Sequence, residues 1–252
     1  MQIDLVSRGM FMRALSKSAP ASLLILNLLF LTPADSNAIG KAQKRKENSS
    51  NTRSRALNRA DLKSAEARLA EMGYGTGRNG LVAFQKYEGR KITGQLNRDE
   101  LAAIMSSSAP QAKDPGYKHV EVDLDRQVLL LTDDAGAVTK ILPVSTGSEK
   151  HYREKGMSGL AYTPRGRFRI YSKIGGWRKS PLGLLYYPNY FSDGLAIHGN
   201  PSVPQTPQSH GCIRVPMSAA VDVYKQLPVG TIVLIYDKQS FVSAKEWIGR
   251  EQ

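Results

Sequence analysis

The sequence predicts a mainly β domain with one or two helices, preceded by a small domain of three helices. Two observations carry this prediction. Apolar residues recur at helical spacing through residues 56–107, whereas short alternating or continuous apolar runs fill residues 117–240. Between these regions, residues 108–116 have the Ala, Pro and Gly content of a linker. The 252 residues are therefore expected to hold one small and one medium-sized domain.

Apolar spacing and end signals define the three expected helices. The first covers residues 61–72 and is followed by Gly73, a residue type that favours helix C-termini. The second covers residues 81–87, and Asn97 is expected to cap the third. The residues expected on the buried faces are Leu62, Ala65, Leu69, Met72, Leu81, Phe84, Tyr87, Leu101 and Ile104.

In residues 117–240, the apolar pattern predicts strands joined by turns and long loops. The expected strands are residues 119–123, 127–132, 138–144, 166–174, 195–198 and 231–236. Residues 133–136 are expected to form a hairpin turn, and residues 218–226 a helix. Residues 175–190 mix glycine, aromatic and basic residues, and we expect a loop that covers a binding site. His119 and His151 match no motif and are expected to be ordinary surface or strand residues.

Residues 1–38 have the layout of a secretory signal peptide. Arg8, Arg13 and Lys17 precede a short apolar run at residues 21–31, and small residues follow at 36–38. The run is short for a membrane span, although an uncleaved anchor is the alternative. In both cases the rest of the chain is expected outside the cytoplasm. Residues 39–55 read as a basic, disordered linker, and residues 241–252 as a C-terminal tail.

The charge balance favours an anionic partner. The chain has 35 Lys and Arg against 22 Asp and Glu, a formal net charge of +13. Nucleic acid, an acidic membrane face and the bacterial wall would all fit that charge. Export and the lack of a nucleic-acid-binding motif argue against nucleic acid. Contact with a membrane is expected only through an uncleaved signal.

Cys212 is the one cysteine of the sequence, and its neighbours suggest a reactive thiol. A lone cysteine in an exported chain is either a buried inert residue or a free nucleophile. His210 stands two residues before Cys212, and His198 fourteen before it. A nearby imidazole can draw the proton from a thiol, and Gly211 permits a tight turn whose backbone N–H groups converge. Such a turn is suited to acyl transfer.

Two stretches carry a resemblance to a known family. Residues 196–199 (AIHG) with residues 208–215 (QSHGCIRV), and residues 163–170 (TPRGRFRI), resemble the L,D-transpeptidase catalytic domain over about residues 118–237. This resemblance implies an L,D-transpeptidase-like β-sandwich or barrel. Residues 56–107 resemble a peptidoglycan-binding domain, with a generic three-helix bundle as the alternative.

The resemblance also implies roles for single residues. Cys212 would be the nucleophile, His198 the base, and the Gly199 carbonyl the group that orients its imidazole. Backbone N–H groups of His210, Gly211 and Cys212 would stabilise the oxyanion, with Ser209 and the His210 side chain shaping the site. Arg214 would bind a substrate carboxylate or form a structural ion pair. Trp177, Tyr187 and Tyr190 are the expected substrate contacts of the covering loop.

The implied activity is acyl transfer on peptidoglycan stem peptides in the periplasm or at the wall face. Cys212 would form a thioester at the third-residue carbonyl of a tetrapeptide, and a second stem would accept it in a 3→3 cross-link. Water, a lipoprotein or a free D-amino acid are alternative acceptors, and water would make the enzyme an L,D-carboxypeptidase. No metal or cofactor is expected. The rival hypotheses are a zinc hydrolase using His198, His210 and Cys212, and a non-catalytic wall-binding protein.

Overall fold

The computed structural model describes residues 56–240. The expected signal peptide, the basic linker at residues 39–55 and the tail at residues 241–252 lie outside the described residues. Within residues 56–240, no helix is both long enough and apolar enough to cross a bilayer.

Three helices form the N-terminal part of the described chain, which we call the helical unit (residues 56–107). They are α2 (Arg59–Glu71), α3 (Gly77–Tyr87) and α4 (Arg98–Ser106). The Asn97 side chain accepts a hydrogen bond from the Glu100 N–H at 2.8 Å, so Asn97 caps α4 as the sequence predicts. Gly73 follows α2 with a φ of 88°, a conformation that favours glycine. Leu62 was expected to be buried but is 46% exposed, because α2 packs through Ala65 and Leu69, further along the helix.

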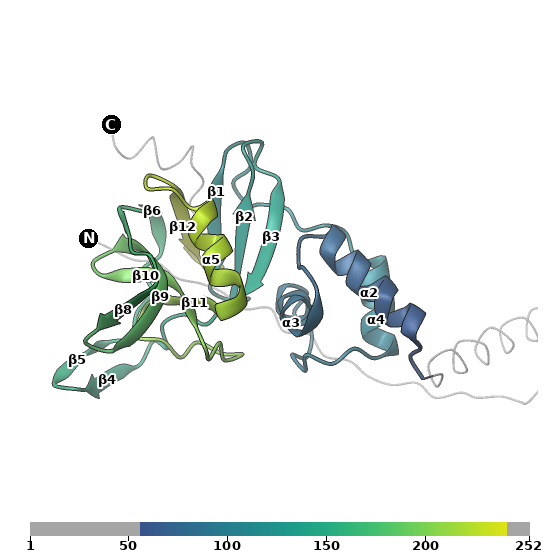
Figure 1. Ribbon diagram of the computed structural model, residues 1–252, viewed down its shortest axis with the longest axis horizontal. Helices are drawn as coiled ribbons and strands as arrows, with labels where there is room; N and C mark the ends of the chain where they lie inside the picture. The colour runs from purple at the N-terminus through teal and green to yellow at the C-terminus, as the bar shows by residue number, and fades with distance from the viewer. Residues whose placement is uncertain (1–55, 241–252) are drawn as a thin grey trace, which may run out of the picture. The chain divides into compact units, whose positions relative to one another are not determined.

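A five-stranded sheet forms one layer of the β domain, as Figure 1 shows. Its strands, in spatial order, are β3 (Val138–Pro143), β2 (Val128–Thr132), β1 (His119–Asp123), β12 (Ile232–Tyr236) and β6 (Gly166–Arg169). The pairing of β1 with β12 is parallel, and the other pairings are antiparallel. The last strand of the described chain therefore lies inside this sheet.

The second sheet carries most of the residues that the sequence singles out. It contains β11 (Ile213–Pro216), β10 (Leu195–Asn200), β9 (Gly183–Ser192) and β7 (Ser172–Lys173), and β8 (Trp177–Ser180) also pairs with β9. β4 (His151–Glu154) and β5 (Met157–Leu160) form a separate hairpin. The helix α5 (Met217–Gln226) packs on β9, β10 and β11. This mainly β architecture confirms the predicted fold class.

Strand alternation divides the buried residues into two cores. On β2, Leu129 and Leu131 join the main core, together with Ile197 and Ile213 of the second sheet. The alternate residues of β2 point to the other face and pack with the helical unit. Their core is made by Ala65, Leu69, Met72, Tyr74, Leu81, Ala83, Phe84, Ile104, Val128, Leu130 and Ile141. The helical unit and the five-stranded sheet thus share a continuous apolar core.

Several expected boundaries were wrong. Residues 166–174 do not form one strand, because the chain changes sheets there: Ile170 bonds to Thr231, and Tyr171 bonds to Tyr190. Residues 175–190 are not a loop but mostly the β8–β9 hairpin, whose strands are stabilised by their own ladder. The hairpin β4–β5 and the strand β11 were not predicted from the sequence.

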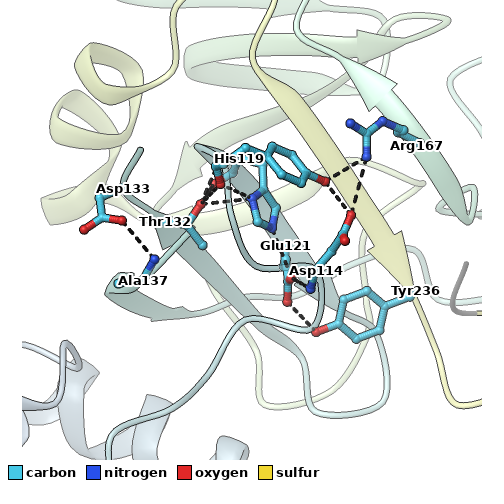
Figure 2. Close-up of polar contacts among 9 residues, drawn as sticks. Asp114, His119, Glu121, Thr132, Asp133, Ala137, Arg167 and Tyr236 are labelled. Atoms are coloured by element: carbon cyan, nitrogen blue, oxygen red, sulfur yellow. Dashed lines mark hydrogen bonds and ion pairs between the residues drawn. The ribbon is translucent and has the colours of Figure 1, made fainter. Parts of the chain in front are cut away.

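A buried polar network lies on the five-stranded sheet (Figure 2). His119 is 1% exposed, and its Nε2 lies 3.0 Å from Glu121 Oε1. The Tyr236 hydroxyl donates to Glu121 Oε2 at 3.0 Å, and the Asp114 N–H donates to Oε1 at 2.9 Å. His119 is therefore a strand residue, one of the two placements expected for it. His119, Tyr236 and the Asp114 N–H are hydrogen-bond partners of the buried Glu121 carboxylate, which would be costly to bury alone.

Candidate active site

Strand pairing places three of the singled-out side chains on one face of the second sheet. β10 and β11 run parallel, with His198 opposite Arg214 and Ile197 opposite Ile213. Opposed residues of paired strands share a face, and residues two apart on one strand share it as well. Cys212 precedes Arg214 by two residues, so it lies on the same side as His198. The alternate residues, Ile197 and Ile213, point into the main core.

These side chains open onto a cavity of about 470 Å³. Cys212, His198, His210 and Arg214 all line it. The β4–β5 hairpin contributes Tyr152 and Met157, and the β8–β9 hairpin contributes residues 178–185. The cavity is therefore bounded by the second sheet and two hairpins, and its size suits a small peptide substrate.

The imidazole of His198 is held in the form of a base. Its Nδ1 lies 2.9 Å from the Gly199 carbonyl oxygen, and a carbonyl only accepts, so Nδ1 carries the proton. In the neutral ring, Nε2 is then the unprotonated nitrogen, which can accept a proton. Burial, together with the nearby Arg214 charge, lowers the pKa of His198 to about 4, against the opposing effect of the Gly199 hydrogen bond. His198 is thus neutral at ordinary pH and able to accept a proton.

Gly199 serves this arrangement in a second way. A Cβ at this position would lie 2.6 Å from the Ala220 Cβ and 3.0 Å from the Tyr186 ring. Glycine therefore lets α5 pack directly against β10, behind His198. That packing fixes the strand end that carries the imidazole.

The thiol of Cys212 is half-buried and touches a backbone donor. The Ala196 N–H points at Sγ, 3.5 Å away. Burial raises the pKa of the Cys212 thiol, while the Ala196 N–H and the Arg214 charge act to lower it. The raised pKa of the Cys212 thiol and the lowered pKa of the His198 imidazole both favour the neutral form of these two groups, which line the same cavity. The thiolate–imidazolium pair considered from the sequence is not the favoured resting state.

The turn before the thiol, residues 206–212, is called the cysteine turn below. Gly211 has a φ of 136°, and a Cβ there would lie 2.7 Å from the Tyr162 carbonyl oxygen, so glycine is required. The Ser209 hydroxyl accepts from the Gly211 N–H at 3.0 Å and donates to the Cys212 carbonyl at 2.5 Å. Ser209 thus acts as a clamp within the turn.

This clamp corrects the expected oxyanion site. The N–H groups of His210, Gly211 and Cys212 were expected to form this site. The Gly211 N–H is already bonded to Ser209. Within residues 56–240, the N–H groups of His210 and Cys212 have no acceptor, so two of the three expected donors remain for a substrate oxygen.

Residues 144–148, called the bracing segment below, hold the cysteine turn from behind. Ser145 exchanges backbone hydrogen bonds with Arg214, and its hydroxyl donates to the Thr206 carbonyl at 2.9 Å. The Ser209 N–H donates to the Thr146 carbonyl at 2.8 Å. Thr163 accepts from the Gly147 N–H and donates to the Gly211 carbonyl, both at 2.8 Å. The motif at residues 163–170 therefore begins with a residue that ties the bracing segment to the turn.

Arg214 provides positive charge inside the cavity. Its side chain is half-buried, and burial lowers the pKa of the guanidinium, which stays charged. No carboxylate of residues 56–240 forms an ion pair with it. Of the two roles expected for Arg214, the arrangement fits a carboxylate-binding role better than a structural ion pair.

His210 faces the β4–β5 hairpin, which the sequence analysis did not anticipate. The Tyr152 ring meets the His210 ring edge-on, with centroids 4.6 Å apart. Glu154 Oε2 lies 3.5 Å from His210 Nε2. Tyr152, Glu154 and Met157 were missed because residues 151–160 are mostly exposed and polar, without apolar alternation. A tyrosine and a glutamate two residues apart were the sole sequence signal.

The three aromatic residues expected to cover a substrate have different placements. Tyr190 lines the cavity. Trp177 is 51% exposed and packs on Tyr186, outside the cavity. Tyr187 packs between Tyr186 and Tyr224 of α5. The structure therefore does not support the expected roles of Trp177 and Tyr187, whose rings are taken up by packing between β9 and its neighbours.

The zinc hypothesis required His198, His210 and Cys212 to form a ligand set. Among residues 56–240, no three His, Cys, Asp or Glu side chains are grouped so that they could hold a metal ion. His198 Nδ1 is bonded to a carbonyl, and His210 Nε2 faces Glu154. His198, His210 and Cys212 are therefore not arranged as one ligand set within residues 56–240.

Comparisons with known proteins relate the β domain to a known family. Residues 117–235 match the family model described as the YkuD L,D-transpeptidase catalytic domain. A crystallised L,D-transpeptidase from Xylanimonas cellulosilytica is 35% identical, with a TM-score of 0.65, and the match covers 69% of this chain and 92% of that one. An L,D-transpeptidase from Stackebrandtia nassauensis is 26% identical over 69% and 90% of the two chains, with a TM-score of 0.43. No curated protein matches the chain.

Proposed function

Because the chain belongs to the L,D-transpeptidase family, we propose that it transfers peptidoglycan stem peptides through a thioester on Cys212. One observation carries the proposal. A single cavity presents the thiol of Cys212, a bare imidazole nitrogen and two free backbone donors. A nucleophile, a base and an oxyanion site are the parts that acyl transfer requires.

In the first half-reaction, His198 Nε2 takes the Cys212 proton as Sγ attacks the carbonyl of the third stem residue. The N–H groups of His210 and Cys212 bind the oxyanion. The tetrahedral intermediate then collapses, the terminal D-alanine leaves with the proton from His198, and a thioester remains on Cys212. Proton transfer during attack fits the neutral resting pair, since no preformed thiolate is required.

In the second half-reaction, an amine attacks the thioester and frees the thiol. A side-chain amine of a second stem gives a 3→3 cross-link. Arg214 holds a carboxylate of the stem peptide within the cavity. Two half-reactions through one covalent intermediate predict ping-pong kinetics.

The proposal includes export to the periplasm or the wall face, where the substrate lies. Support comes from the signal-like layout of residues 1–38 and the net charge of +13. Binding of peptidoglycan by the helical unit stays a prediction.

Incubation of the purified protein with a disaccharide-tetrapeptide, followed by mass spectrometry, tests the function. Wild-type protein should form a 3→3-linked dimer that is absent with Cys212→Ala. Tripeptide without dimer would move the assignment to an L,D-carboxypeptidase. Transfer to an added lipoprotein peptide or D-amino acid would identify a different acceptor. No Cys212-dependent product of any kind would refute the proposal and leave a wall-binding protein.

A further inference from the structure

A buried lysine of the helical unit reaches toward the active-site region. Lys86, on α3, is 3% exposed, and its Nζ donates to the Val144 carbonyl oxygen at 2.7 Å. No carboxylate of residues 56–240 forms an ion pair with it. Burial lowers the pKa of Lys86 to about 8, as expected for an ammonium without a counter-ion. An apolar side chain would fill this space at a smaller desolvation cost, so packing alone does not explain a lysine here.

The acceptor of this hydrogen bond is the first residue of the bracing segment. Next to Val144, the Ser145 backbone pairs with Arg214, at distances of 3.2 and 3.0 Å. The Ser145 hydroxyl also accepts from the Gln208 N–H at 3.1 Å. Further along, the Ser148 N–H donates to the Ser209 carbonyl at 3.0 Å. A shift of the segment at Val144 would therefore be passed to both ends of the cysteine turn.

Lys86 is well placed to fix that position, because α3 is itself anchored. Phe84, two residues before it, is fully buried in the core shared with β2 and β3. The Ile141 N–H of β3 donates to the Gly73 carbonyl at 2.8 Å, and this hydrogen bond attaches the C-terminal end of α2 to β3. Lys86 thus connects the anchored helix α3 to the bracing segment by a direct side-chain hydrogen bond.

We propose that Lys86 is a positioning residue, which fixes the Val144 carbonyl and through the bracing segment holds the cysteine turn in its reactive geometry. In this role the helical unit stabilises the conformation of the cysteine turn, in addition to any binding of the cell wall. This inference rests on the proposed function of Cys212. It concerns geometry and not substrate contact, because Lys86 does not line the cavity.

Lys86→Met tests the proposal, because methionine keeps the length and apolar stem of lysine but has no donor. With the disaccharide-tetrapeptide, we expect kcat to fall by about 10- to 100-fold, as small misplacements of catalytic groups do, and KM to stay within about twofold. Lys86→Arg, which keeps a cationic donor, should recover most of kcat. The matched control is Lys63→Met, at an exposed lysine of α2, which should behave as wild type. A Lys86→Met kcat within about twofold of wild type would overturn the proposal.

A second measurement separates this proposal from the proposed function. Hydrogen exchange followed by mass spectrometry reports the Ser145, Ser148 and Ser209 amides without any substrate. Their exchange should accelerate in Lys86→Met and not in Lys63→Met, and unchanged exchange would overturn the positioning role. If wild-type protein makes no Cys212-dependent product, the proposed function fails, while the exchange result still decides the role of Lys86. Should Lys86→Met not fold, Lys86→Gln is used, whose shorter side chain stops short of Val144.

Discussion

The molecule buries two histidines on neighbouring sheets and uses them differently. His119 is 1% exposed and His198 is 3% exposed, so burial does not distinguish them. Both ring nitrogens of His119 have partners: Nδ1 lies 2.8 Å from the Tyr117 carbonyl oxygen, and Nε2 faces Glu121 (Figure 2). Among the described residues, His198 has a hydrogen-bond partner at Nδ1 alone, and it lines a cavity. A ring nitrogen that faces a cavity, and not burial, therefore distinguishes the histidine that we propose as the base.

The largest expected effect is the loss of the base. His198→Ala should reduce Cys212-dependent product formation by about 10²- to 10⁴-fold, the usual contribution of a positioned general base. The free energy of unfolding should change little, because His198 makes one side-chain hydrogen bond. Initial rates with the tetrapeptide, beside urea unfolding, check both statements. His151→Ala, at an exposed histidine of β4, is the control. A variant with more than a tenth of wild-type activity would contradict the role of His198.

The converse substitution should affect stability and leave the chemistry intact. His119→Ala removes a partner of the buried Glu121 carboxylate and should lower the free energy of unfolding by about 3 kcal/mol. Activity per folded molecule should stay near wild type, since His119 does not line the cavity. Urea unfolding gives the first quantity and rates at low temperature the second. A loss of turnover at full folding would break the distinction between the two histidines.

The pH dependence of thiol alkylation should sharpen the picture of His198. With the pKa of His198 near 4 and that of Cys212 raised, thiolate is scarce at neutral pH and increases as pH rises. The rate of iodoacetamide reaction at this single cysteine should therefore climb about tenfold per pH unit from pH 6 to pH 8. Mass spectrometry of the alkylated protein follows it. A rate that is flat across that range would indicate a preformed thiolate–imidazolium pair instead.

The smallest effects concern aromatic residues inside and outside the cavity. Tyr190→Ala removes a ring from the cavity wall and should lower kcat/KM by about tenfold, if the ring buries substrate surface as aromatic side chains usually do. Trp177→Ala removes a half-exposed ring outside the cavity and should leave kcat/KM within about twofold. Steady-state kinetics of the two variants compare them directly. Equal losses of kcat/KM in the two variants would mean that the position of Tyr190 in the cavity wall does not determine its effect on catalysis.

Local signals in the sequence were enough for part of this molecule. The fold class followed from apolar spacing, and Asn97 was identified as a cap because capping depends on residues three positions apart. Cys212 and His198 were predicted as site residues from a short motif, and both line one cavity. The glycines of that motif have local steric causes, as the close approach of Gly211 to the Tyr162 carbonyl shows.

The remaining features depend on contacts that a sequence does not display. The β4–β5 hairpin buries little, so its residues lack the alternation that predicts strands. The Ser209 clamp removes an expected oxyanion donor through a hydrogen bond whose geometry exists only once the turn has formed. Lys86 reaches a carbonyl 58 residues away, and its apolar helix neighbours gave no reason to single it out.

The position of β12 in the first sheet has a consequence for the folding of the protein. β12 lies between β1 and β6, and its register pairs His119 with Ile232, residues far apart in the chain. Before β12 is in place, β1 and β6 have no strand between them, and the first sheet is in two parts. Pairing over such sequence distances is slow, because a long loop must close first. A chain that stops before β12 therefore has every residue singled out at the candidate site, but it lacks the strand that joins the two parts of the sheet on which the second sheet packs.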